Sequence, residues 1–185
     1  MSLFTSARER RLWLWLLALM VVIYSTLGTQ GILVEALRER NLLRVSIYLV
    51  MLVVVGSFVA YTAKRHPGRR EIWVALGVMG AYLWAFTRMQ SLEERTHLLE
   101  YGVVAVLIHE ALLERRRNGR RVPVPAVLAV VVTALLGWLD EGIQALLPNR
   151  VYDLRDVGFN ALAGLMVIAA RLALARVRRR RPSRR

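Results

Sequence analysis

Polar side chains that can bind a ligand or exchange a proton are concentrated in the segment DEGIQALLPNRVYDLRDVGFN, residues 140–160. They are Asp140, Glu141, Gln144, Arg150, Asp153, Arg155, Asp156 and Asn160. Long apolar runs lie on both sides of this segment. Ionisable groups at the edge of a bilayer are costly, and by default they mark a functional site. The segment is therefore the first candidate for a binding or catalytic site.

The first half of the segment predicts the polar end of a helix. Residues three and four apart share a helix face, so Asp140 and Glu141 both neighbour Gln144. Pro148 stops the helix, and Arg150 follows in the turn. This helix end offers two carboxylates and an amide, with a guanidinium nearby that can hold a phosphate through paired hydrogen bonds.

The second half predicts the start of another helix. Asp153 is placed to cap it, and a carboxylate also suits the positive end of the helix dipole. Asp153, Asp156 and Asn160 are spaced i, i+3, i+7 and share one face. Gly164 continues this face by one turn, where a small residue lets a neighbouring helix approach closely.

A second polar motif lies upstream, in ERTHLLEYG at residues 94–102. Glu94, His97 and Tyr101 are spaced i, i+3, i+7, so they share one face of a predicted helix. A histidine beside paired carboxylates is suited to general acid–base chemistry, for example on a lipid-linked phosphate. His97, Asp140 and Glu141 are therefore the candidate catalytic residues.

The elements that must position these motifs are apolar runs, in a chain that is 56% hydrophobic. The six runs are Leu12 to Leu27, Val45 to Ala63, Ile72 to Thr87, Leu98 to Leu113, Val124 to Leu139 and Val157 to Leu174. Their lengths predict an all-α, polytopic transmembrane helix bundle with about six spans. The fourth run is the weakest, because it contains Glu100, His109 and Glu110, so five spans are the alternative.

The net charge of +14 follows from the way the basic residues are distributed along the chain. Most of the 27 Lys and Arg residues lie near the N-terminus, in alternate loops and in the C-terminal tail. By parity these regions share one side of the membrane, so both termini are expected to be cytoplasmic. The charge is thus a topology signal. Membrane lipids are expected as partners, and nucleic acid is not.

The two polar motifs share the other side of the membrane, so they should meet in one outward-facing pocket between the fourth, fifth and sixth runs. The expected ligand-binding residues are Glu94, His97, Tyr101, Asp140, Glu141, Gln144, Arg150, Asp153, Asp156 and Asn160. The alternative is a structural polar network that ties three helix ends together. Deeper in the membrane, Glu110 and Arg171 lie at similar depth, and we predict an ion pair between them.

We expect no metal and no cofactor. His97 is the one histidine near the cluster, and no spacing such as H-E-x-x-H occurs. An oxygen-rich Mg²⁺ or Ca²⁺ site is the form of metal binding that the residues leave open. The chain has no cysteine, which excludes disulfides and thiolate chemistry.

The two motifs resemble those of VanZ-like bacterial membrane proteins. E-x-x-H-x-x-x-Y-G at residues 94–102 is similar to the first motif of that family, and D-E-x-x-Q-x-x-x-P-x-R-x-x-D-x-x-D-x-x-x-N at residues 140–160 to the second. Gly164 fits a glycine that follows. Where the family often has a Lys shortly before its His, this chain has Glu94 and Arg95. The resemblance implies a small bundle of membrane helices and a link to resistance to the glycopeptide teicoplanin, but it implies no particular reaction.

From these observations we expect a single transmembrane helical domain at residues 1–175 and a basic, disordered cytoplasmic tail at residues 176–185, in the bacterial cytoplasmic membrane. The outer pocket would bind a cell-envelope ligand such as a lipid-linked headgroup, a lipid-linked cell-wall intermediate or a glycopeptide. One alternative is an enzyme that uses acid–base chemistry on a lipid-phosphate or glycan intermediate. Another is a structural or assembly partner of an envelope complex. We favour binding over catalysis.

Overall fold

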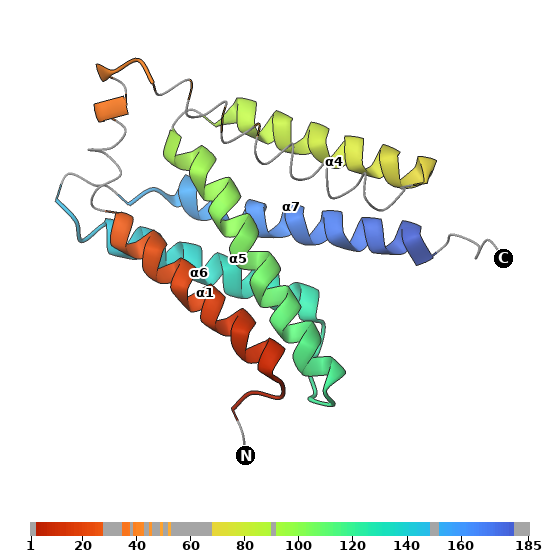
Figure 1. Cartoon of the computed structure of the whole chain (residues 1–185). Coiled ribbons are helices and arrows are strands. Elements are labelled where there is room, and N and C mark those ends of the chain that lie inside the picture. Colours follow the sequence, from red (N-terminus) through yellow and green to blue (C-terminus); the bar gives the residue numbers. More distant parts are fainter. Residues whose placement is uncertain are drawn as a thin grey trace.

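The computed structural model describes residues 3–27, 35–37, 39–42, 68–89, 92–148 and 152–179, together with residues 45, 49 and 52. The described part is helical and contains no strand, which confirms the all-α class. Figure 1 shows its helices. Their bounds are α1 (Ala7–Thr26), α4 (Arg69–Arg88), α5 (Leu92–Arg117), α6 (Pro125–Gln144) and α7 (Leu154–Arg179).

Three of the described helices are long and apolar enough to cross a membrane, judged by length and composition. They are residues Arg95–Arg117 of α5, all of α6 and all of α7. They correspond to the fourth, fifth and sixth predicted runs, so the fourth run, the weakest of the six by sequence, is one of the three. The first and third predicted runs form the 20-residue helices α1 and α4.

Some predictions fall outside the described residues. The second predicted run, 45–63, lies mostly outside. At the C-terminus, α7 continues as a helix to Arg179 and so includes the first four residues of the predicted tail. Residues 180–185 lie outside the described part.

The distribution of polar and apolar residues on α6 is that of a membrane helix. Its buried side carries small or polar residues, including Ala129, Thr133 and Gly137. Its exposed side carries large apolar residues, namely Val127, Val131, Leu135 and Trp138. Soluble proteins rarely expose a continuous row of large apolar side chains to water. Lipid tails are as apolar as these side chains, so contact with lipid does not destabilise them. Helix α6 thus turns its small and polar residues toward the bundle and its large apolar residues outward.

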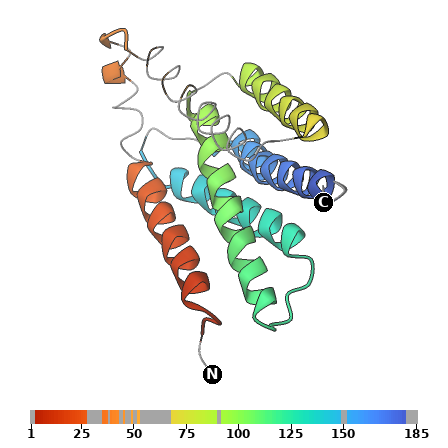
Figure 2. The same ribbon diagram turned by 45° about the vertical axis from the view of Figure 1, so that its right-hand side comes forward.

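Helix α5 is the centre of the bundle. It packs against α1, α6 and α7, while α6 also packs on α7, and α4 lies along α7. Both views show α5 between α1 on one side and the α4–α7 pair on the other (Figure 2). Every described helix therefore contacts either α5 or α7, and the structure of the site depends on these two.

The sequence explains how α1 begins. The Ser6 side chain caps the helix by accepting the Glu9 backbone N–H at 3.0 Å. The Glu9 carboxylate reaches back to accept the Thr5 backbone N–H at 2.7 Å. Reciprocal capping of this kind satisfies N–H groups that the first helical turn leaves without partners. It fixes the start of α1 just before its apolar run.

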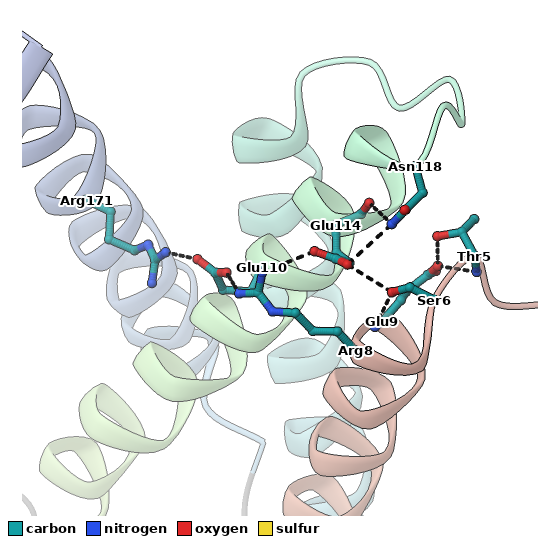
Figure 3. Close-up of polar contacts among 8 residues, drawn as sticks. All are labelled: Thr5, Ser6, Arg8, Glu9, Glu110, Glu114, Asn118 and Arg171. Atoms are coloured by element: carbon teal, nitrogen blue, oxygen red, sulfur yellow. Dashed lines mark hydrogen bonds and ion pairs between the residues drawn. The ribbon is translucent and has the colours of Figure 1, made fainter.

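Ion pairs hold the basic helix ends together (Figure 3). Glu110 of α5 binds Arg171 of α7, which confirms the predicted ion pair. Arg8 of α1 binds both Glu110, at 2.8 Å, and Glu114, at 3.1 Å. The start of α1, the end of α5 and the second half of α7 therefore meet on one side, opposite the polar motifs.

Helices α6 and α7 approach each other closely at two glycines. A Cβ atom placed on Gly137 would lie 2.5 Å from the Cβ of Asn160. A Cβ atom on Gly164 would lie 3.1 Å from Thr133 Cγ2, which agrees with the close approach predicted at Gly164. Small residues at such positions let membrane helices pack backbone to backbone. They bring the polar end of α6 directly against the first turns of α7.

Candidate functional site

The beginning of α5, the end of α6 and the beginning of α7 meet at one side of the bundle and bring the predicted polar residues together. Five of these side chains are almost completely buried: His97 and Glu141 are 1% exposed, and Tyr101, Asp140 and Asn160 are 0% exposed. We refer to these five residues, with Gln144 and Asp156, as the polar cluster. It contains two residues from α5, three from α6 and two from α7.

Asp140 connects α6 to α5. The Tyr101 hydroxyl donates a hydrogen bond to Asp140 Oδ2 at 2.9 Å, and His97 Nε2 lies 3.8 Å from the same oxygen. The rings of His97 and Tyr101, one helical turn apart, meet edge to face with their centroids 5.9 Å apart. This carboxylate therefore binds the Tyr101 hydroxyl and lies next to His97, the two cluster residues that α5 contributes.

Glu141 connects α6 to the start of α7. Its Oε2 accepts the backbone N–H of Asp153 at 3.2 Å, and its Oε1 accepts a hydrogen bond from Gln144 Nε2 at 3.4 Å. Asp153 in turn caps α7, because its Oδ1 accepts the backbone N–H of Arg155 at 2.7 Å. The predicted capping role of Asp153 is thus confirmed, and Asp153 contacts the cluster through its backbone.

Asp156 and Asn160 complete the cluster from α7. One ligand atom each of His97, Glu141 and Asp156 lie within 4.8 Å of one another, although the three residues come from three helices. Asn160 packs one turn deeper against Gly137. Among the described residues, neither amide atom of Asn160 has a hydrogen-bond partner.

The side chains of two further predicted site residues lie outside the described part. The backbone of Glu94 lies in the first turn of α5, but its side chain is outside the described part, as is Arg150 entirely. Arg95, beside the first motif, is directed to the end of α4, where it donates a hydrogen bond to the Met89 carbonyl at 3.0 Å and lies over the Phe86 ring.

Tyr24 lies near the cluster but was not among the predicted site residues. The Tyr24 hydroxyl of α1 donates a hydrogen bond to the Leu136 carbonyl at 3.1 Å, one turn before Asp140. The Tyr101 hydroxyl lies 3.4 Å from the same carbonyl. A single tyrosine in an apolar run gives no signal of such a role, because tyrosines are common at membrane interfaces.

The cluster is closed. Because its central side chains are buried, a ligand larger than an ion or a water molecule reaches them only if the surrounding helix ends move. An apolar groove of about 790 Å³ does exist, but it lies between α4, α5 and α7, on an adjacent face of α5. It is lined by residues such as Tyr82, Phe86, Leu98 and Val103. The groove and the cluster are thus separate features.

No family model matches this chain, and neither a curated protein nor a solved structure does. The VanZ-like resemblance therefore rests on the two motifs and stays a prediction. In chemical terms, the cluster brings together an imidazole, a phenol, two amides and three carboxylates. Such a set can bind a cation or transfer protons, and it can bind a phosphate once the carboxylate charge is neutralised.

Proposed function

We propose that this chain is a VanZ-like, multi-pass protein of the bacterial cytoplasmic membrane, with both termini cytoplasmic and the polar cluster on the outer side. The cluster binds the phosphate-bearing headgroup of a lipid-linked cell-envelope molecule, and this binding is linked to glycopeptide susceptibility. The observation that carries the proposal is the convergence of buried polar side chains from three apolar helices at one end of the bundle.

The energetics support binding rather than a purely structural role. Replacing buried ionic groups by apolar ones of similar size is often neutral or stabilising, so stability alone does not call for them. Three carboxylates within one cluster raise the cost further, because like charges repel. A ligand or a bound proton that the carboxylates hold offsets this cost.

A second candidate function is acid–base catalysis on the same headgroup. The specific observation in its favour is the position of His97, whose Nε2 lies beside Asp140 and whose ring is held against Tyr101. A carboxylate that orients a histidine is a common arrangement in sites that transfer protons.

The proposed orientation can be tested because the chain has no native cysteine. Leu146 is 85% exposed just after α6, and Asn118 lies exposed after α5, at the other end of the bundle. In intact cells, a membrane-impermeant maleimide should label Leu146→Cys, and it should label Asn118→Cys only after permeabilisation. The reverse pattern would place the cluster in the cytoplasm and overturn the proposal.

Headgroup binding is tested with the full chain in nanodiscs that contain a polyprenyl phosphate. We expect His97→Ala to weaken binding at least about tenfold, since it removes an imidazole donor to the phosphate, whereas Glu141→Gln removes a negative charge and should not weaken binding of the anion. Glu114→Gln, at the opposite end of the bundle, is the matched control and should bind like the wild type. Loss of phosphate or glycan from the lipid by the wild type, absent in His97→Ala, would favour the enzyme. Equal binding by all variants would contradict both functions.

Glycopeptide susceptibility is measured in cells that carry the same variants. We expect His97→Ala to change teicoplanin susceptibility at unchanged protein abundance. If every cluster variant instead falls in abundance while headgroup binding by the purified protein is unaffected, the cluster is a structural network.

A further inference from the structure

We propose that His97, Glu141 and Asp156 form a binding site for one divalent transition-metal ion, of the Zn²⁺ or Mn²⁺ kind. Their ligand atoms lie within 4.8 Å of one another. Bonds from such ions to imidazole nitrogen and carboxylate oxygen are about 2.0–2.2 Å long, so three ligand atoms spaced evenly around one ion lie at most about 3.8 Å apart. An inward shift of about 0.6 Å by each ligand atom is therefore enough to close the site.

The position of the three residues supports this inference. His97 and Glu141 are buried, and Asp156 is partly buried, in a bundle whose outer surface is apolar. Charged groups in such a place are paired or coordinate a metal. A single ion is also small enough to enter a closed cluster that a lipid headgroup cannot enter without movement of the helices.

Asn160 gives an independent indication. It is 0% exposed, and among the described residues neither its Oδ1 nor its Nδ2 is hydrogen-bonded. It lies one turn after Asp156 on α7, and it packs against Gly137, one turn before Glu141 on α6. Buried amides are nearly always hydrogen-bonded. A buried amide one helical turn from Asp156 and next to the α6 turn before Glu141 would be satisfied by water coordinated to the ion.

The residues around the three ligands would hold them in place. Glu141 is fixed by the Asp153 backbone N–H and by Gln144. Asp140 lies beside His97 and itself accepts the Tyr101 hydroxyl. A carboxylate next to a metal-bound histidine fixes the ring and raises its basicity. Asp140 is therefore a positioning residue in this proposal and not a ligand.

The donor set indicates the class of ion. One imidazole nitrogen and two carboxylate oxygens suit Zn²⁺ or Mn²⁺, whereas Ca²⁺ takes six to eight oxygen ligands. The two carboxylates neutralise the charge of the ion. Three protein ligands also leave coordination positions open. A phosphate oxygen can fill one of them; this last step alone rests on the proposed headgroup binding.

Metal binding is tested on the purified full chain in detergent, without added lipid. Calorimetric titration with Zn²⁺ and electron paramagnetic resonance with Mn²⁺ should each show one ion per chain. His97→Ala, Glu141→Gln and Asp156→Asn should each lower the affinity at least about tenfold. His109→Ala is the matched control, since His109 is also buried in α5 but lies three turns away. The proposal is overturned if the wild type binds no ion, or if His109→Ala weakens binding as much as His97→Ala.

A second variant, His97→Cys, distinguishes the loss of a metal ligand from the loss of the folded structure. Because the chain has no cysteine, His97→Cys would introduce its one thiolate. On addition of Co²⁺ this variant should show a sulfur-to-cobalt absorption band in the near ultraviolet, and His109→Cys should not. A folded His97→Cys protein without the band would contradict the site. Headgroup binding and ion binding are measured separately, so a bound ion without headgroup binding would refute the proposed function and leave the metal site standing.

Discussion

The closest contact between α6 and α7 leads to a quantitative prediction for Gly137→Ala. The new Cβ would lie 2.5 Å from Asn160 Cβ, about 1 Å less than the optimal separation of two carbon atoms. Because both atoms are attached directly to helix backbones, rotation of a side chain cannot relieve the contact, and the helices must move apart. Overpacking of this kind costs about 1–3 kcal/mol.

The same substitution also gives a gain, which a matched variant measures. Alanine is favoured over glycine within a helix by about 0.5–1 kcal/mol. Gly142→Ala, also in α6, gains this amount without a steric cost, since nothing lies within 4 Å of its new Cβ. The difference between the two variants is then the overpacking cost alone. Gly164→Ala should fall between them, because its nearest neighbour, Thr133 Cγ2, would be 3.1 Å away.

The assay is thermal or denaturant unfolding of the full chain in one detergent, followed by helical circular dichroism. We expect stability to fall in the order Gly142→Ala, Gly164→Ala, Gly137→Ala. Asn160→Gly, which removes the opposing Cβ, should restore part of the loss when it is combined with Gly137→Ala, as a double-mutant cycle would reveal. If Gly137→Ala proves as stable as Gly142→Ala, the described approach of α6 and α7 is refuted.

Three further predictions follow from the polar contacts. Glu110→Ala should destabilise the protein more than Arg171→Ala does, by about 1 kcal/mol in thermal unfolding, because Glu110 binds two arginines and Arg171 one carboxylate; equal losses would contradict this. Burial alone would raise the pKa of Glu9, but hydrogen bonds from neighbouring residues and a nearby arginine lower it below its usual value. The ionised Glu9 carboxylate therefore stabilises the fold at pH values above the usual glutamate pKa of about 4.3. This stabilisation is lost as the pH falls through the lowered pKa of Glu9 in the folded protein, so Glu9→Gln should make stability less dependent on pH in the acid range. Tyr101→Phe should cost about 1–3 kcal/mol in denaturant unfolding, because Asp140 loses a buried donor; an unchanged midpoint would argue against that hydrogen bond.

Helical spacing was sufficient to predict much of the cluster. The i, i+3, i+4 rule places His97 and Tyr101 on one face of α5, and Asp156 and Asn160 on one face of α7. In the structure His97, Tyr101 and Asn160 are buried, and Asp156 is partly buried. The spacing works because a membrane helix has few polar residues, so those it has must face the bundle interior. The Glu110–Arg171 pair was predictable for the same reason.

Contacts between helices that are distant in sequence could not be predicted in this way. The three proposed metal ligands, His97, Glu141 and Asp156, lie on three different helices. No short sequence motif therefore indicates a metal site, and from the sequence we expected none. Tyr24 hydrogen-bonds to the backbone of α6, 112 residues later. The depth of burial was also not predictable, since it depends on the Gly137–Asn160 contact and not on residue type.

The order of packing has a consequence for the synthesis of the protein. Within the described part, α1 packs on α5, and α4 packs on α7, so each of these two early helices has a partner that is translated later. Arg8 and Glu9 are at the start of the chain, but their ion-pair partners are translated much later. Arg8 pairs with Glu110 and Glu114, and Glu9 pairs with Arg115. Helices α5, α6 and α7, by contrast, pack on their neighbours in sequence. Among the described helices, α5, α6 and α7 can therefore pack on one another as soon as they are made, whereas α1 and α4 gain their described partners only when α5 and α7 follow.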